Sequence, residues 1–381
     1  MSRIEQLIAE LCPDGVEYKE IESLINDKSI LTITPPSKLT KSLYKSVGTF
    51  PIIDQGKDFI VGYTNDKEKT ITEGFYIVFG DHTEAIKYVD FTFAQGADGI
   101  KILKTDNERI IAKYLYYSLN NFYIKTGKYT RHFSFLRKTS IPIPPLPIQQ
   151  EIVNILDKFT ALDASLQAEL EARKKQYEHY RNQLLNFEGK DVEWKQLGEI
   201  AYYPNSRISA SEVDETNYVG VENLLQNKQG KSLSNYVPTT GNLIEYKTHD
   251  ILIGNIRPYL KKNWMATNNG GTNGDVVVIR INSVFYLRII PKYLHFALSS
   301  DIFFDYNNQF AKGGKMPRGD KNAILKFKIP ITPLAEQERI VEILDKFDKL
   351  VNKELPAEIA ARRKQYKYYR EKLLTFEPLI S

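Results

Sequence analysis

The sequence predicts an α+β protein made of two similar units joined by two long helices. Three observations support this fold class. Two helix-like blocks recur half a chain apart, apolar residues inside them are spaced by three and four, and the segments between the blocks are β-rich. The length of 381 residues suits two or three globular domains. We expect globular units at 1–144 and 189–331, and helical regions at 145–188 and 332–381.

The repeat is clearest in the helical regions. Residues 151–159 (EIVNILDKF) recur as 339–347 (RIVEILDKF), an offset of 188 residues, 339 minus 151. Residues 172–181 (ARKKQYEHYR) recur as 361–370 (ARRKQYKYYR), an offset of 189 residues, 361 minus 172. A repeat with a period of half the chain predicts the order globular unit, helix, globular unit, helix.

Apolar residues spaced by three and four form a seam along each helical region. The seam residues are Phe159, Leu162, Leu166, Leu170, Tyr177, Tyr180 and Leu184 in the first region and Phe347, Leu350, Leu355, Ile359, Tyr366, Tyr369 and Leu373 in the second. Matching seams allow the helices to pair within one chain. In the alternative, each helix packs only on its neighbouring unit.

Prolines mark the expected limits of these helices. Pro147 and Pro333 suit the first helical position, where no backbone donor is needed. Pro356 predicts a break near 350–355, because an interior proline removes a backbone hydrogen bond and clashes with the preceding turn.

The segments between the blocks read as matched sets of strands and short helices. Runs of β-branched and aromatic residues bounded by Gly, Asp and Asn predict strands at 75–79, 99–103, 251–253 and 275–281. Short helices are expected at 113–119 and 292–298. Similar frames with diverged surfaces suggest two related tasks with different targets.

Composition and motifs exclude most catalytic classes. No Gly-x-Gly-x-x-Gly or Gly-Lys-Ser/Thr phosphate loop and no amino-methyltransferase motif occurs, and the five histidines lack metal-ligand spacing, so we expect no catalytic set, cofactor or metal. Asp14, Glu17 and Lys19 superficially resemble a metal-dependent nuclease signature. Glu193 and Lys195 repeat Glu17 and Lys19 at the start of the second half, which indicates a structural strand common to both halves. Cys12 is the single cysteine, and no membrane-length apolar run or secretory signal occurs, so we expect a cytoplasmic protein.

Basic and aromatic residues gather in loops of both globular units. A net charge of +5 permits nucleic-acid binding without arguing for it. Lysines can neutralise phosphates and an arginine can pair with guanine in the major groove. The candidates in the first unit are Asp81, His82, Thr83, Lys87, Lys128, Arg131 and His132, and those in the second are Asn255, Arg257, Tyr259, Lys261, Lys262, Lys312, Lys315 and Arg318.

The duplicated motif Pro-Leu-x-x-Gln, at 145–149 and 333–337, precedes Ile-Val-x-Ile-Leu-Asp-Lys-Phe and Arg-x-Lys-Gln-Tyr-x-x-Tyr-Arg in both halves. With these motifs the chain resembles, over nearly its whole length, the specificity subunits of type I restriction-modification systems. Residues 48–56 with Gly62 and Tyr63, and 79–83 with 95–99, resemble framework motifs of one recognition-domain subtype, which adds Gln55 and Tyr63 to the candidates. Residues 254–259 and 272–275 resemble another subtype.

The resemblance implies a non-catalytic, sequence-specific DNA-binding subunit. Each recognition domain would read one half of a bipartite, asymmetric site in double-stranded DNA, and the helices would pair antiparallel as a spacer. Two modification subunits would carry the methyl donor, and motor-nuclease subunits, which use the nucleotide, would join for cleavage. Two alternatives stay open: a coiled-coil adaptor that binds no DNA, and a self-sufficient modification enzyme, for which a methyl-donor motif is missing.

Overall fold

The computed structural model describes residues 2–96 and 99–379. These fall into two compact units, the first within Met1–Ser165 and Ile359–Ser381 and the second Leu166–Glu358. Each unit therefore contains a globular part and a portion of both long helices. The expected α+β class is confirmed, with helices and mainly antiparallel sheets in both units.

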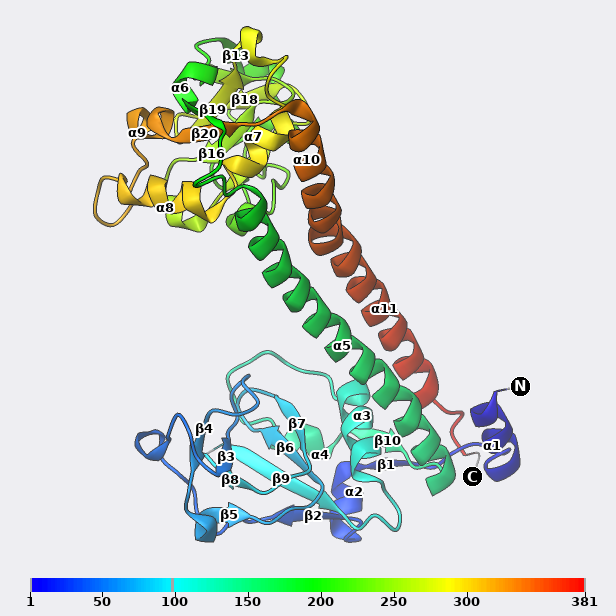
Figure 1. The fold of residues 1–381 in the computed structure, drawn as a ribbon. Coiled ribbons are helices and arrows are strands. Elements are labelled where there is room, and N and C mark those ends of the chain that lie inside the picture. The colour runs from blue at the N-terminus through cyan, green and yellow to red at the C-terminus, as the bar shows by residue number, and fades with distance from the viewer. Residues whose placement is uncertain (1, 97–98, 380–381) are drawn as a thin grey trace. The chain divides into compact units, whose positions relative to one another are not determined.

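The first unit combines small sheets with helices packed on them (Figure 1). Its helices are α1 (Arg3–Leu11), α2 (Ile21–Asn26), α3 (Ala112–Phe122), α4 (Phe133–Arg137), the start of α5 (Leu146–Leu184) and the end of α11 (Leu355–Leu374). Its strands are β1 (Tyr18–Glu20), β2 (Ile30–Ile33), β3 (Phe50–Ile53), β4 (Gly62–Thr64), β5 (Thr70–Ile71), β6 (Tyr76–Gly80), β7 (Ile86–Val89), β8 (Phe93–Gln95), β9 (Ile100–Thr105) and β10 (Ser140–Pro142). They form sheets of order β2-β9-β6-β7, β4-β3-β8-β5 and β1-β10.

The second unit repeats this plan. Its helices are the end of α5, α6 (Leu197–Ile200), α7 (Pro291–Ala297), α8 (Asp301–Gln309), α9 (Lys321–Lys326), α10 (Leu334–Lys349) and the start of α11. Its strands are β11 (Glu193–Gln196), β12 (Ala201–Tyr202), β13 (Arg207–Ser209), β14 (Tyr218–Val219), β15 (Asn242–Tyr246), β16 (Ile251–Gly254), β17 (Asn263–Met265), β18 (Gly270–Thr272), β19 (Val276–Ile281) and β20 (Lys328–Ile331). The sheet orders β12-β19-β16-β17 and β11-β20 parallel those of the first unit, whereas the third sheet, β13-β15-β18-β14, has its parallel pair β14·β18 at the edge and the sheet β4-β3-β8-β5 has its parallel pair β3·β8 in the centre.

The predicted strands and short helices are confirmed as β6, β9, β16, β19, α3 and α7. In the first unit a single apolar cluster joins the central sheet to α3 and α5, through Phe79, Leu103, Leu115 and Ile152, all fully buried. The alternation of strand residues and the helical spacing of α3 and α5 place these side chains on facing surfaces. The long helix is therefore part of the unit's core.

A buried glutamine fixes the start of each long helix to its unit. The Gln149 side chain donates to the carbonyls of Arg109 (2.9 Å) and Pro144 (2.8 Å) and accepts from the Ile111 N–H (2.9 Å). In the second unit Gln337 makes the equivalent bonds, at 2.8, 2.8 and 2.9 Å, to Arg288, Thr332 and Ile290. Both glutamines are 0% exposed. These bonds explain why the glutamine belongs to the duplicated motif.

The long helices pack side by side in the first unit (Figure 1). The Phe159 ring of α5 lies 6.1 Å from the Tyr366 ring and stacks at 5.6 Å on the Tyr369 ring of α11. One turn further along α5, Asp163 pairs with Arg363 at 2.7 Å. From the first contact to the second, the residue number rises along α5, from 159 to 163, and falls along α11, from 369 to 363. The two helices are therefore antiparallel.

The second unit contains the counterpart of this contact. The Phe347 ring of α10 stacks on Tyr177 (6.0 Å) and Tyr180 (5.4 Å) of α5. The Tyr177 hydroxyl donates to the Asp348 carboxylate (3.3 Å). The predicted pairing within the chain is confirmed, and the alternative of two unpaired helices is wrong.

The other predicted seam residues differ in burial. Leu170, Leu355 and Ile359 are buried, whereas Leu162 and Tyr369 are 38% and 37% exposed. Half-buried positions are Leu166, Leu184, Leu350 and Leu373. The seam is therefore closed in some stretches and partly open to solvent in others.

The expected break near 350–355 takes the form of a π-helical turn between two α-helices and not of a loop. α10 passes through a π-helical turn, η7 (Leu350–Glu354), directly into α11, which begins at Leu355. Pro356 is the second residue of α11, where its missing N–H matters little after the wider i→i+5 bonding of the π turn. The other prolines shift by one position: Pro333 is the N-cap of α10, and Pro147 is the second residue of α5.

Candidate nucleic-acid interface

In the first unit the loop after β6 supports a second loop that precedes α4. The Asp81 carboxylate accepts hydrogen bonds from the N–H groups of His132 (2.9 Å) and Phe133 (2.8 Å). The Asp81 N–H donates to the Gly99 carbonyl (2.7 Å). Asp81 and His132 are 7% and 0% exposed. The structure thus brings these two predicted residues together as supports of a loop, buried from solvent.

Glu84, which the sequence reasoning missed, holds the base of the same loop. Its carboxylate accepts from the Tyr123 hydroxyl and from the N–H groups of Thr126 and Gly127, each at 2.8 Å. Burial alone would raise the pKa of Glu84, but these hydrogen bonds outweigh it and lower the pKa. The residue has φ +56°, a left-handed conformation that is unusual for glutamate. The available signal was its position directly after the predicted residues 81–83.

The loop 124–131 presents cations and apolar side chains to solvent. Lys125, Lys128 and Arg131 are exposed, and Tyr129 is 90% exposed. His82 is half-buried, stacks on the Tyr129 ring at 5.3 Å and lies 3.1 Å from the Thr130 carbonyl. This combination of exposed positive charge with an aromatic face suits phosphate contacts and stacking on a base.

Several other predicted residues of this unit have structural contacts. The Thr83 hydroxyl donates to the Gln55 carbonyl, and the Gln55 side chain accepts from the His82 N–H (3.3 Å). Lys87 is 6% exposed and donates to the carbonyls of Asp54 (2.8 Å) and Asp58 (2.6 Å). Burial lowers the pKa of Lys87.

Tyr63 belongs to a different part of the first unit. It is half-buried on β4, where its backbone pairs with Lys45. Of the motif at 95–99, Ala97 and Asp98 lie outside the described residues.

In the second unit, the predicted residues 255–259 and 312–318 come together. The Arg257 N–H donates to the Pro317 carbonyl (2.7 Å), and Ile256 forms a β-bridge with Arg318. The Asn255 N–H donates to the Asp275 carbonyl (2.9 Å), as the Asp81 N–H does to Gly99 in the first unit. Asn255 is 5% exposed. The two units therefore use the same backbone frame to hold different loops.

The loop 312–318 is closed by two backbone hydrogen bonds between Lys312 and Arg318, of 2.9 and 2.8 Å. Its Lys312, Lys315 and Arg318 are exposed. Lys312 pairs with Asp320 (2.6 Å) and Arg318 with Asp275 (3.2 Å), with lysine and arginine side chains that are 81% and 58% exposed. Ion pairs this exposed are weak, so a phosphate can replace the carboxylate.

The neighbouring residues 257–262 divide into exposed and anchored side chains. Tyr259 is 53% exposed, on the 3₁₀ turn η5 (Pro258–Leu260). Lys261 pairs with Asp301 (2.6 Å), and Lys262 donates to the Val221 carbonyl (2.5 Å). Arg257 is half-buried, and its Nε has no hydrogen-bond partner among the described residues.

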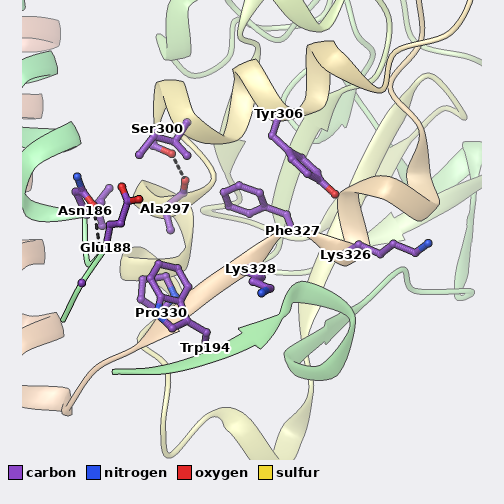
Figure 2. Close-up of a pocket in the computed structure, with 13 residues that line it drawn as sticks. Asn186, Glu188, Trp194, Ala297, Ser300, Tyr306, Lys326, Phe327, Lys328 and Pro330 are labelled. Atoms are coloured by element: carbon purple, nitrogen blue, oxygen red, sulfur yellow. Dashed lines mark hydrogen bonds between the residues drawn. The ribbon is translucent and has the colours of Figure 1, made fainter. Parts of the chain in front are cut away.

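A cavity of 570 Å³ in the second unit lies beside the end of α5 (Figure 2). Trp194, Phe327 and Pro330 line it, and the Ser300 hydroxyl beside it donates to the Ala297 carbonyl (2.7 Å). The Ser300 hydroxyl is therefore bonded to a backbone carbonyl and not to a side-chain base. In the part of the chain that the structure describes, no cluster of histidine, cysteine or carboxylate side chains suits a metal, and no helix could span a membrane.

Comparisons with known proteins agree with this arrangement. The chain matches the family described as "Type I restriction modification DNA specificity domain" twice, at residues 16–172 and 189–361. It is 34% identical to the EcoR124I/EcoR124II type I restriction enzyme specificity subunit of Escherichia coli, over 99% of this chain and 97% of that one. A putative type I restriction enzyme specificity subunit of Haemophilus influenzae is 28% identical, over 95% of this chain and 96% of that one.

Solved structures share the fold. The S subunit of a type I restriction-modification system from M. genitalium superposes with a TM-score of 0.59 at 14% identity, covering 94% of this chain and 96% of that one. The duplicated family match, the full-length similarity to a known specificity subunit and the loop frame shared by both units lead to one conclusion. The chain belongs to the type I restriction-modification DNA specificity family and is a specificity subunit with two recognition domains.

Proposed function

We propose that each recognition domain reads one half of a bipartite, asymmetric site in double-stranded DNA. The recognition domains are residues 1–144 and 189–331, and the helical regions 145–188 and 332–381 connect them. The observation that carries the proposal is one backbone frame holding two dissimilar basic loops, 124–131 in the first unit and 312–318 in the second. A shared frame with different side chains is what two different half-sites require.

The proposed reading residues are mainly cations and aromatic side chains of these loops and of the segments beside them. Lys128 and Arg131 serve the first half-site, with His82 and Thr83 beside them. The second half-site meets Arg257, Tyr259, Lys312, Lys315 and Arg318. Lysines would neutralise phosphates, and an arginine fork can pair with guanine O6 and N7. Asp81, His132, Asn255 and Lys261 hold these loops in place, and Gln55 contacts His82 and Thr83. Lys87 and Lys262 bind carbonyls of neighbouring segments.

The paired helices would set the distance between the half-sites and dock the partners. α5 has 39 residues and begins in one unit and ends in the other. At 1.5 Å per residue it is about 58 Å long, which is on the order of a turn and a half of B-DNA. We propose two modification subunits as partners, joined by motor-nuclease subunits for cleavage.

Catalysis lies in partner subunits, which would bind the methyl donor and the nucleotide. The target adenine would be flipped into a modification subunit's pocket. The proposal places the chain in the cytoplasm, where the DNA of a bacterial cell lies. A coiled-coil adaptor is the rival function, and it would show no salt-dependent DNA affinity, whereas phosphate contacts predict a steep fall in DNA binding as salt rises.

The test compares loop variants in the complex with the modification subunits. Lys128→Ala with Arg131→Ala should weaken discrimination at the first half-site only, and Arg257→Ala or Arg318→Ala at the second only. Loss of one arginine contact to guanine should cost about 1–3 kcal/mol of discrimination. Binding to duplexes altered in one half-site measures this. Lys247→Ala, an exposed lysine of the second unit outside these loops, is the control. Equal discrimination in all variants would contradict the proposed reading surface.

A further inference from the structure

Two loops of the second unit keep an unusual backbone conformation. Asn227, Lys228, Arg257 and Lys261 have φ of +54°, +64°, +52° and +51°. These values are left-handed, which disfavours residues with a Cβ. The loops touch, because the Lys228 N–H donates to the Lys261 carbonyl (2.8 Å). Such a concentration of strained residues persists only where surrounding contacts hold it.

Charged side chains provide these contacts. The Lys228 ammonium lies 2.9 Å from Glu178 and 3.3 Å from Asp301, and its side chain is 8% exposed. Lys261 pairs with the same oxygen of Asp301 at 2.6 Å. Asp301 therefore joins the two strained loops. Burial would raise the pKa of Asp301, but the bond to Lys261 and the two lysine charges lower it to about 2.

The cluster is also attached to the long helix. Glu178 belongs to α5, and the next turn of α5 supplies Arg181, whose side chain is 3% exposed. Arg181 bonds to Glu178 (3.2 Å) and to the Ser299 carbonyl (2.9 Å), and its guanidinium lies over the Tyr177 ring (4.2 Å). Three cations share two carboxylates here, so loss of either carboxylate leaves three cations with a single carboxylate, and the side chains of two of these cations, Lys228 and Arg181, are only 8% and 3% exposed.

Among the described residues of the first unit, this arrangement does not recur at the equivalent positions of the repeat. By the internal repeat, the counterpart of Glu178 is Lys367, which reverses the charge. The counterpart of Arg181 is Arg370, which donates to Asn121 (3.4 Å). The cluster therefore serves the second recognition domain, whose reading loop includes Arg257 and Tyr259.

We propose that Asp301 and Glu178 are positioning residues for the reading of the second half-site. With Lys228, Lys261 and Arg181 they hold the strained backbone that presents Arg257 and Tyr259 and fix it to α5. Lys228 and Lys261 are then structural cations and contact no phosphate. The inference rests on the proposed reading of the second half-site by the Arg257 loop.

The test uses the full chain, free and in complex with the modification subunits. Asp301→Asn should speed amide hydrogen exchange in segments 226–229 and 257–262 by about tenfold, because the loops open locally more often. In the complex, discrimination at the second half-site should fall by about tenfold, a change of 1.4 kcal/mol, and discrimination at the first should not change. Glu342→Gln, which removes a carboxylate from an exposed pair on α10, is the matched control.

A second variant covers the case in which Asp301→Asn does not fold, since Asp301 also begins α8. Lys261→Gln removes the more exposed ion pair of the cluster, Lys261–Asp301, and leaves the Lys228–Glu178 pair intact. It should give the same selective loss, and Lys261→Arg should restore discrimination.

Two results separate this inference from the proposed function. Unchanged exchange in both segments overturns the positioning cluster, whatever the DNA measurements give. The second result is that Asp301→Asn exchanges faster but still discriminates fully at the second half-site, while Arg257→Ala loses that discrimination. This result overturns the positioning role and leaves the proposed reading surface standing. If Arg257→Ala also discriminates normally, the proposed reading surface fails, and the role of Asp301 in reading fails with it.

Discussion

Individual side chains fix the recognition loops and helix starts through buried polar contacts. The repeat in the sequence singled out Gln149 and Gln337, because each ends a duplicated motif. It could not show that both are fully buried and that each binds three backbone groups at equivalent places in its own unit. Hydrogen-bond partners of this kind come from segments about 40 residues away, and a linear pattern does not record them.

Replacement of Gln149 by Leu should destabilise the first unit. Gln149→Leu leaves the Ile111 N–H and the carbonyls of Arg109 and Pro144 without their partner. A buried unsatisfied group costs about 1–3 kcal/mol, so we expect a loss in this range or above it in urea unfolding. Gln150→Ala, on the exposed neighbouring residue, is the control and should change stability little. Equal stability of both variants would contradict the anchoring role.

Glu84 should make the loop 124–131 sensitive to acid. Its folded pKa lies below 4.5, so its contribution is present above that pH and is lost as the pH falls through the lowered value. Glu84→Gln places an amide against a backbone donor and should cost about 1–3 kcal/mol. In Glu84→Gln, hydrogen exchange of residues 124–131 should be faster than in the wild type, and it should not change with the protonation of a carboxylate at position 84. Wild-type protection that is already lost above pH 4.5, or that acid does not remove at all, would contradict the assignment.

At the level of elements, the long helices were predictable and their local details were not. Spacing by three and four identified the seam, and the contacts of Phe159 and Phe347 follow from it. The rule that proline interrupts helices predicted a break before Pro356, but a π turn absorbs the irregularity. Which loop side chains are exposed depends on tertiary contacts, so Lys87 and Asp81 were indistinguishable from Lys128 in the sequence.

The aromatic contacts between the helices should contribute measurably to stability. Phe159→Ala removes the ring that packs on Tyr366 and Tyr369 in the first unit. Because Phe159 is half-buried, we expect a loss of about 2–3 kcal/mol, below the 3–5 typical of fully buried rings. Urea unfolding measures it, with Lys158→Ala on the exposed neighbouring residue as the control. A loss no larger than that of the control would mean that the helices pair through other residues.

On the scale of the whole molecule, duplication is the organising feature. The helical repeat predicted two equivalent units, and the sheet orders β2-β9-β6-β7 and β12-β19-β16-β17 agree. The strand order itself was not predictable, because it depends on pairing between distant segments whose sequences have diverged. The proposed reading loops, 124–131 and 312–318, differ in sequence, as two different targets would require.

The most direct test of the account is to shorten both long helices by one turn. Four residues are removed from α5 and four from the second helix, where each passes from one unit to the other, and methylated adenines are mapped genome-wide with the modification subunits present. Four residues span about 6 Å, so both half-sites should persist with a gap one or two base pairs shorter. An unchanged gap, or altered half-sites, would contradict two independent reading domains held apart by paired helices.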